Sequence, residues 1–172
     1  MTATQDPAAT DRPPTLSAGE RLSILRATRS VAILGMSTDA SRASYFVATY
    51  LLSSSCSFER VWFVNPKGGH VLGQPVFPSL ASLPEPPELV DVFRRAEDLP
   101  AVADEVVAVD GTRTFWCQLG LWSDEAARIA HAGGRNVVMN RCLKIEHARF
   151  AGGLHLAGFD TGVISSRRRP DL

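Results

Sequence analysis

Short apolar runs alternate along this chain with segments in which apolar residues recur at helical spacing. Runs of about four apolar, partly β-branched residues that end in glycine or polar residues are typical of fully buried strands. Apolar residues three and four positions apart, in places preceded by a capping residue or an early proline, are typical of helices. The pattern predicts strands at 31–34, 61–64, 89–93, 114–117 and 136–139, and helices at 16–28, 45–52, 97–109 and 123–132.

The remaining segments carry turn signals or little apolar content. Between Gly68 and Pro87 there are five prolines and three glycines, which predict a loop with at most one helical turn near 79–82. Residues 1–14 are rich in Thr, Ala, Pro and Asp, and we expect a disordered leader there. We therefore expect one domain at 15–150, followed by a C-terminal extension at 151–172 that ends in a basic tail.

The alternation of strands and helices predicts the fold class. Strands separated by helices of this length form a parallel sheet with helices on both faces, which gives a three-layer α/β domain. We expect the five strands, numbered along the chain, to lie in the order 3-2-1-4-5. A crevice then lies beyond the carboxyl ends of strands one and four, where the winding of the sheet reverses.

Composition excludes several classes of function. Lys and Arg together number 18, as do Asp and Glu, so no overall field attracts nucleic acid or an acidic membrane. The three cysteines have no short-spaced pair, which argues against a disulfide framework or a zinc site and favours a reducing cytoplasm. Neither a signal-peptide pattern nor an apolar run of about 18 residues is present, so we expect no membrane span.

Hydrogen-bonding side chains follow each predicted strand. Carboxyl ends of parallel strands share one edge of a sheet, and glycine followed by a helix start is suited to phosphate. Arg42 and Lys67 supply the cations that phosphate prefers. The pattern favours a nucleotide-containing ligand, although Asn65-Pro66 also fits a simple turn and Phe93 also fits a core residue. The strand-end residues are Gly35, Ser37, Asn65, Lys67, Arg94, Gln118, Asn140 and Arg141.

Two features argue against a dinucleotide. Gly35 is followed by Met36 and Ser37, so the remaining glycines of a G-x-G-x-x-G turn are missing. The second strand ends in Asn65-Pro66-Lys67, without the acidic residue that binds the ribose of NAD. An NAD(H)-binding redox sensor or oxidoreductase stays open as an alternative.

Cys142 and the four histidines are the candidates for catalysis. Arg141 and Lys144 adjoin Cys142 and would lower the pKa of its thiol. No nucleophile–His–acid arrangement follows from the sequence, however, and a structural role for Cys142 is the favoured interpretation. The histidines show no metal-ligand spacing. We therefore predict no catalytic residue and no metal.

Six segments together resemble, in order and spacing, the small stand-alone CoA-binding proteins, which are similar to the N-terminal domain of the succinyl-CoA synthetase α subunit. The likeness extends over about residues 22–146 and implies a Rossmann-like CoA-binding domain. The family pattern has an aspartate and a proline where this chain has Asn140 and Leu143. The matching segments are 32–37, 42–45, 64–67, 90–94, 116–120 and 138–142.

The resemblance also implies a site for coenzyme A. Residues from Gly35 to Arg42 would hold phosphates, Asn65 to Lys67 would flank the nucleotide, Phe93 and Arg94 would line the adenine side, and Gln118 would lie near the pantetheine arm. The implied binding residues are Gly35, Met36, Ser37, Thr38, Arg42, Ser44, Tyr45, Asn65, Pro66, Lys67, Phe93, Arg94 and Gln118.

The sequence thus predicts a protein that binds coenzyme A or an acyl-CoA. It would act as a stand-alone carrier, sensor or regulatory module, without acid-activating activity of its own. A homo-oligomer or an unidentified protein partner is compatible with this interpretation. A protein–protein adaptor with a vestigial nucleotide crevice remains a further alternative.

Overall fold

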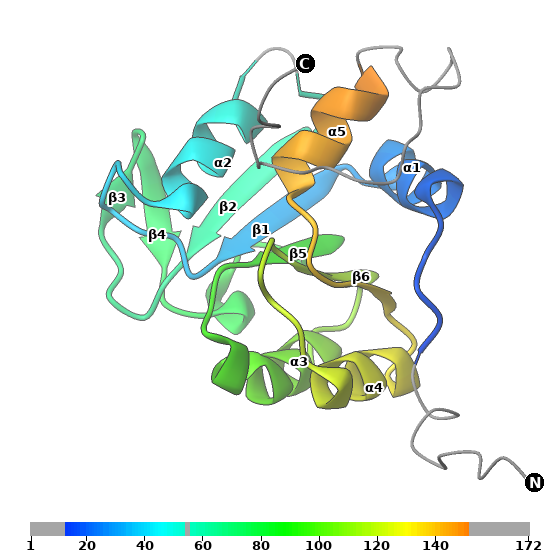
Figure 1. The fold of residues 1–172 in the computed structure, drawn as a ribbon. Coiled ribbons are helices and arrows are strands. Elements are labelled where there is room, and N and C mark those ends of the chain that lie inside the picture. Colours follow the sequence, from blue (N-terminus) through cyan, green and yellow to red (C-terminus); the bar gives the residue numbers. More distant parts are fainter. Residues whose placement is uncertain (1–12, 54–55, 152–172) are drawn as a thin grey trace, which may run out of the picture.

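The computed structural model describes residues 13–53 and 56–151, which form a sheet between two layers of helices (Figure 1). The predicted leader and C-terminal extension lie almost entirely outside the described residues. The strands are β1 (Ser30–Leu34), β2 (Arg60–Val64), β3 (His70–Val71), β4 (Gln74–Phe77), β5 (Leu89–Val92), β6 (Thr114–Cys117) and β7 (Asn136–Val138). The helices are α1 (Ala18–Ala27), α2 (Ala43–Leu51), α3 (Leu99–Val107), α4 (Asp124–Ala132) and α5 (Leu143–Ala151), with short 3-10 turns η2 (Leu80–Ser82) and η3 (Ala96–Asp98).

The three-layer α/β architecture is confirmed. Helices α1, α2 and α5 lie on one face of the sheet, and α3 and α4 lie on the other (Figure 1). Side chains of β1 alternate between the two apolar layers, so that Val31 and Ile33 pack in the first and Ala32 and Leu34 in the second. All five residues of β1 are buried, as expected for a central parallel strand.

The predicted strand number and order are wrong. The sheet has seven strands in the order β3-β4-β2-β1-β5-β6-β7. Strand β1 pairs with β2 on one side and with β5 on the other, all parallel. The five predicted strands therefore lie in the order 2-1-3-4-5. The reversal of winding consequently lies between β1 and β5, and the crevice predicted beyond strands one and four moves there.

The hairpin β3–β4 explains why the predicted strand number and order are wrong. It lies in the segment between Gly68 and Pro87 that the sequence predicts to be a loop, and within that segment only η2 matches the predicted helical turn. Strand β4 pairs in parallel with the outer edge of β2, through Phe63↔Val76 and Val64↔Phe77. That edge is therefore occupied, and β5 crosses back to the free side of β1. Pro75 is tolerated because prolines are accommodated near sheet edges.

The predicted helices are largely confirmed, with two local differences. Ser17 forms a capping box at α1, and the Ser123 hydroxyl accepts the Ala126 N–H at α4. Asp98, the capping-type residue before α3, forms no side-chain cap and instead pairs with Arg95 across η3. Phe46, an apolar residue of the predicted 45–52 helix, is 56% exposed, whereas the neighbouring Val47 is buried. No described helix is long and apolar enough to cross a membrane.

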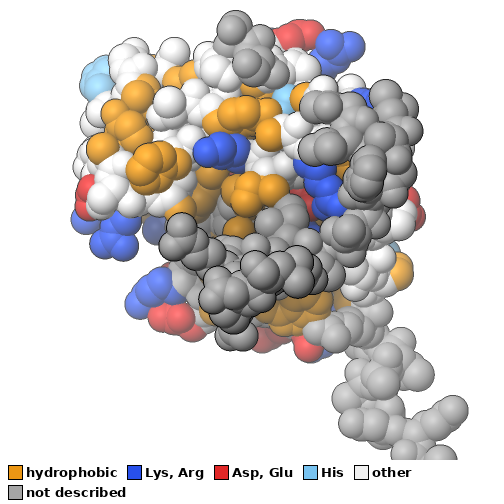
Figure 2. All heavy atoms as spheres, turned by 45° about the horizontal axis from the view of Figure 1, so that its top comes forward, with side chains coloured by type: hydrophobic (Ala, Val, Ile, Leu, Met, Phe, Trp, Pro, Cys, Tyr) orange, Lys and Arg blue, Asp and Glu red, His pale blue; other side chains and the backbone are white. Residues whose placement is uncertain are grey.

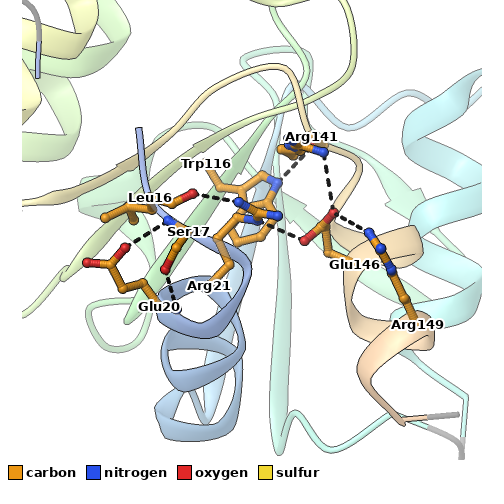
Figure 3. A network of polar contacts seen from close by, with 8 residues as sticks. All are labelled: Leu16, Ser17, Glu20, Arg21, Trp116, Arg141, Glu146 and Arg149. Carbon is orange, nitrogen blue, oxygen red and sulfur yellow. Dashed lines mark hydrogen bonds and ion pairs between the residues drawn. The ribbon is translucent and has the colours of Figure 1, made fainter. Parts of the chain in front are cut away.

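Helix α5 is not predicted from the sequence, and a buried polar network fixes it (Figure 3). The Glu146 carboxylate accepts a hydrogen bond of 2.8 Å from Arg21 Nε on α1, with both side chains buried. Arg141 and Arg149 approach the second oxygen of Glu146 at 3.8 and 4.0 Å. The Trp116 indole N–H on β6 donates to the Arg141 carbonyl at 2.7 Å. The network therefore holds the start of α5 at the end of the sheet.

Candidate functional site

A cavity of about 520 Å³ opens at the carboxyl ends of β1, β5 and β6, beside the beginning of α2. It lies where the winding of the sheet reverses, the usual place for ligands in open α/β sheets. Its volume is within the range of small-molecule sites. The lining residues are Gly35, Ser37, Arg42, Ala43, Ser44, Val47, Phe93, Arg94, Gln118, Leu119, Leu121 and Cys142.

Gly35 allows the carboxyl ends of the central strands β1 and β5 to pack closely against each other. Its φ is +93°, and a Cβ built on it would lie 2.2 Å from the carbonyl oxygen of Phe93. The backbone is tied on both sides, because Gly35 N–H donates to Val64 O and Phe93 N–H donates to Leu34 O, each at 2.8 Å. Glycine at this position therefore serves the close packing of β1 and β5 as well as the cavity wall.

The loop after β1 leads to a helix start that no side chain caps. Ser37 N–H donates to the Ser44 hydroxyl at 3.1 Å, which folds the loop against the first turn of α2. Arg42 occupies the N-cap position without a side-chain hydrogen bond, and the first turn contains no acidic residue. Arg42 itself is 72% exposed and lies 3.8 Å from Asp39. The positive end of the α2 dipole is therefore available to an anion in the cavity.

Part of the set of binding residues implied by the family resemblance lines the cavity, and the rest of the set lies outside its lining. The cavity brings together Gly35, Ser37, Arg42, Ser44, Phe93, Arg94 and Gln118. The residues outside its lining are Met36, Thr38, Tyr45, Asn65, Pro66 and Lys67.

Two of the residues outside the cavity have structural roles in the described chain. Met36 is 1% exposed and packs in the apolar layer beneath α2. The Asn65 amide donates to the Met36 carbonyl at 2.8 Å, and its oxygen accepts the Lys67 N–H at 3.0 Å. Asn65 thus ties the turn after β2 to the loop after β1.

The lining residues that sequence reasoning did not assign to the site are mainly apolar. They are Ala43, Val47, Leu119, Leu121 and Cys142, and of these only Leu119 and Cys142 stand directly beside predicted strand-end residues. Leu119 is 54% exposed, and the loop that carries it is held by a 2.7 Å hydrogen bond from Gly120 N–H to the Asn140 amide oxygen. On the side seen in Figure 2, hydrophobic side chains gather between scattered Lys and Arg side chains.

Cys142 does not have the activated thiol that its neighbours in sequence suggest. Burial raises the pKa of the Cys142 thiol, and this outweighs the opposing effects of backbone N–H groups and of Lys144. A raised pKa disfavours the thiolate, which is the nucleophilic form. Among the described residues lining the cavity there is also no histidine and no carboxylate.

Beneath the cavity lies a buried carboxyl that the sequence analysis did not single out. Asp91 on β5 is fully buried, and the Gln118 amide nitrogen lies 2.7 and 2.9 Å from its two oxygens. Burial raises the pKa of Asp91 to about 8, although the Gln118 hydrogen bonds act in the opposite direction. The only signal in the sequence is an acidic residue inside an otherwise apolar strand.

His147 belongs to a separate cluster at the opposite end of α2. Its Nδ1 lies 2.9 Å from the Tyr50 hydroxyl, and its Nε2 lies 3.0 Å from the Ser57 hydroxyl. Burial lowers the pKa of His147 and thereby favours the neutral imidazole. Because hydroxyl groups satisfy both ring nitrogens, the described contacts give His147 a structural role.

Comparisons with known proteins agree with this fold and show a family. Residues 29–148 match the model of a protein family described as CoA binding domain. The uncharacterized protein YneT of Bacillus subtilis (strain 168) is 35% identical over 132 residues, which span 77% of this chain and 95% of that protein. A structure from Thermus thermophilus named cell-free ID.343 is 32% identical with a TM-score of 0.71, covering 78% of this chain and 99% of its own. A hypothetical protein from Pyrococcus horikoshii OT3 is 29% identical with a TM-score of 0.73, covering 87% and 99%.

Proposed function

Because the chain belongs to the CoA binding domain family, we propose that it binds coenzyme A or an acyl-CoA in the cavity between α2 and the sheet. In this proposal the protein is a stand-alone carrier, sensor or regulatory module and does not itself activate acids. The observation that carries the proposal is the uncapped beginning of α2, which stands beside two arginines at the mouth of the same cavity.

The two ends of coenzyme A require different surroundings, and the cavity offers both. Its phosphates need cations and backbone N–H groups, which Arg42, Arg94 and the first turn of α2 provide. The adenine ring and the pantetheine arm need apolar surface, for which Val47, Phe93 and Leu121 are available. The carrier or sensor role rests on the absence of a catalytic group among the described lining residues.

Binding calorimetry with three ligands tests the proposal. We expect coenzyme A to bind more tightly than 3′-dephospho-CoA, because the cavity gains a charge-assisted contact for each phosphate it holds. NAD⁺ should bind weakest, since the second strand supplies no carboxylate for its ribose. Tighter binding of NAD⁺ or NADH than of coenzyme A would contradict the proposal.

Substitutions at the cavity mouth localise the phosphates. A charge-assisted hydrogen bond is worth about 1.5–3 kcal/mol, so Arg42→Ala or Arg94→Ala should weaken binding by roughly ten-fold to a hundred-fold. Arg95→Ala is the matched control, because Arg95 is exposed and pairs with Glu97 and Asp98 outside the cavity. Lys67 is exposed and does not line the cavity, and Lys67→Ala should therefore weaken binding less than Arg42→Ala. Unchanged affinity in both Arg42→Ala and Arg94→Ala would remove the phosphates from this site.

A further inference from the structure

A carboxyl–carboxamide pair joins the cavity lining, through Gln118, to the buried Asp91. Asp91 lies in the centre of the sheet, in register with Ile33 on β1 and Trp116 on β6, and is completely buried. Gln118 follows β6, lines the cavity and is 6% exposed. Its amide nitrogen is the hydrogen-bond partner of both Asp91 oxygens. The Gln118 carbonyl oxygen is therefore the polar end of this side chain that is left for a ligand.

Among the described residues, the hydrogen-bond partner of the Asp91 carboxyl is the Gln118 amide, and no cation pairs with it. Burial and, to a lesser extent, the Asp91 charge raise the pKa of two thiols, Cys117 on β6 and Cys142 before α5. On β1 the neighbour in register is apolar Ile33, and the buried charges of α1 and α5, Arg21 and Glu146, pair with each other. Burial without a cation raises the pKa of Asp91 to about 8, so both protonation states are accessible near neutral pH.

The proton on Asp91 determines which end of the Gln118 amide faces the cavity. An ionised carboxylate only accepts hydrogen bonds, so it binds the amide N–H groups and leaves the carbonyl oxygen toward the ligand. A protonated carboxyl has an O–H that needs an acceptor, since an unpaired buried donor is costly. Rotation of the amide by half a turn supplies its carbonyl oxygen to that O–H. The amide N–H groups then face the cavity.

We propose that the Asp91–Gln118 pair distinguishes acyl-CoA from CoA by taking up a proton when a thioester binds. The thioester carbonyl oxygen is a hydrogen-bond acceptor and fits the orientation in which Gln118 presents N–H groups. A thiol or thioether sulfur is a much weaker acceptor and gives no such preference. The inference rests on the proposed function, and it makes Gln118 the residue that contacts the ligand and Asp91 the residue that positions it.

The test compares acetyl-CoA with the S-ethyl thioether of CoA, which has no thiol and lacks only the carbonyl oxygen. Calorimetry at pH 8.5 in two buffers with different enthalpies of ionisation gives the number of protons taken up by each complex. We expect acetyl-CoA to take up roughly half a proton or more beyond the thioether. Between pH 7 and pH 9 the affinity for acetyl-CoA should fall about ten-fold relative to that for the thioether, because the protonated fraction of Asp91 falls by that factor.

Two variants test whether Asp91 is the group that takes up the extra proton. Asp91→Asn carries a permanent N–H donor for the Gln118 oxygen, so we expect the extra proton uptake and the ten-fold pH effect to disappear. Cys142→Ala removes the thiol that lines the cavity, and we expect the extra uptake to remain. Thermal unfolding of each variant shows that it is folded.

The outcomes separate the two proposals. If both ligands bind and their complexes take up the same number of protons, the inference is overturned and the proposed function stays intact. Extra uptake that persists in Asp91→Asn, or that is lost in Cys142→Ala, would also overturn it. If neither ligand nor coenzyme A binds, the proposed function fails and the inference fails with it.

Discussion

At the scale of single residues, the same positions serve both the fold and the cavity. Gly35 is the clearest case, because its backbone forms part of the cavity wall while the Phe93 carbonyl occupies the space of a side chain. Any Cβ there must displace backbone atoms of β5, and the positive φ adds strain for a residue other than glycine. A tight turn and a ligand site therefore impose the same requirement on this residue.

Gly35→Ala should destabilise the ligand-free protein by about 3 kcal/mol or more, the sum of a strained φ and an overpacked contact. Gly120→Ala is the matched control, because Gly120 also has a positive φ of +82° but has no heavy atom within 4 Å of a built Cβ. Gly120→Ala should lower the free energy of unfolding by only about 1–2 kcal/mol. Denaturant unfolding measures both free energies, and an equal loss in the two variants would show that the contact with Phe93 relaxes freely.

Asp91 gives a prediction for stability against pH. Its pKa rises from 3.8 in the unfolded chain to about 8 in the folded protein, so between these values the folded state binds the extra proton. Stability is therefore lost as the pH rises through this interval, with a slope of at most about 1.4 kcal/mol per pH unit. Asp91→Asn should remove this contribution, so that its stability relative to the original protein increases from pH 5 to pH 8. A constant difference across that range in urea unfolding would contradict the raised pKa.

The residue scale also shows what the sequence could reveal about the site. Gly35, Arg42 and Arg94 stand at strand ends or at a helix start, and these positions follow from pattern alone. Met36 and Asn65 have the same kind of position, but the core and a turn use their side chains. The choice between a ligand and a neighbouring backbone depends on distances across the sheet, which no local pattern contains.

At the scale of elements, the long apolar strands and four of the five described helices were predictable, and the order of the strands was not. Apolar runs mark buried strands such as β1 and β6 regardless of which strands they pair with. Their order depends on what occupies the free edge of β2, and the β3–β4 hairpin there is too short and too rich in proline to give a strand signal. The crevice therefore lies at another pair of strands than predicted, because its position depends on where the winding of the sheet reverses.

Helix α5 depends on partners far away in the chain, which is why its sequence alone did not identify it. Glu146→Gln should destabilise the protein by about 3–5 kcal/mol, because it leaves Arg21 buried without its carboxylate partner. The control is Glu59→Gln, which breaks the exposed pair with Arg29 and should cost less than about 1 kcal/mol. Denaturant unfolding measures both losses, and similar small values would show that the buried pair contributes little.

At the scale of the whole molecule, the fold brings the cavity and the uncapped start of α2 to the same edge of the sheet, close to the Gln118 side chain that binds buried Asp91. The sequence predicted that edge as the binding edge, since every parallel strand ends there. It could not predict which strand ends converge, because convergence follows from the order of strands in the sheet. The family match agrees with the ligand class.

The last prediction concerns chemistry: the purified protein should not form acyl-CoA from an acid, CoA and ATP or GTP. Activation of a carboxylate by phosphoryl transfer through the protein needs a nucleophilic side chain at the CoA site. The nearest described candidates do not fit, because both nitrogens of His147 are held by hydroxyl groups away from the cavity, and burial raises the pKa of the Cys142 thiol.

The assay is thioester formation across several short acids with each nucleotide, and we expect none above the rate without protein. Cys142→Ser is the informative variant, since it removes the thiol that lines the cavity and substitutes a group of similar size. Turnover by the original protein that is lost in Cys142→Ser would make Cys142 catalytic and overturn the binding-module proposal. Turnover that survives in Cys142→Ser would also overturn it and would place the chemistry elsewhere in the chain. Binding of CoA without turnover in either protein is the result that the cavity favours, because its described polar groups are suited to hold phosphate and carbonyl oxygens.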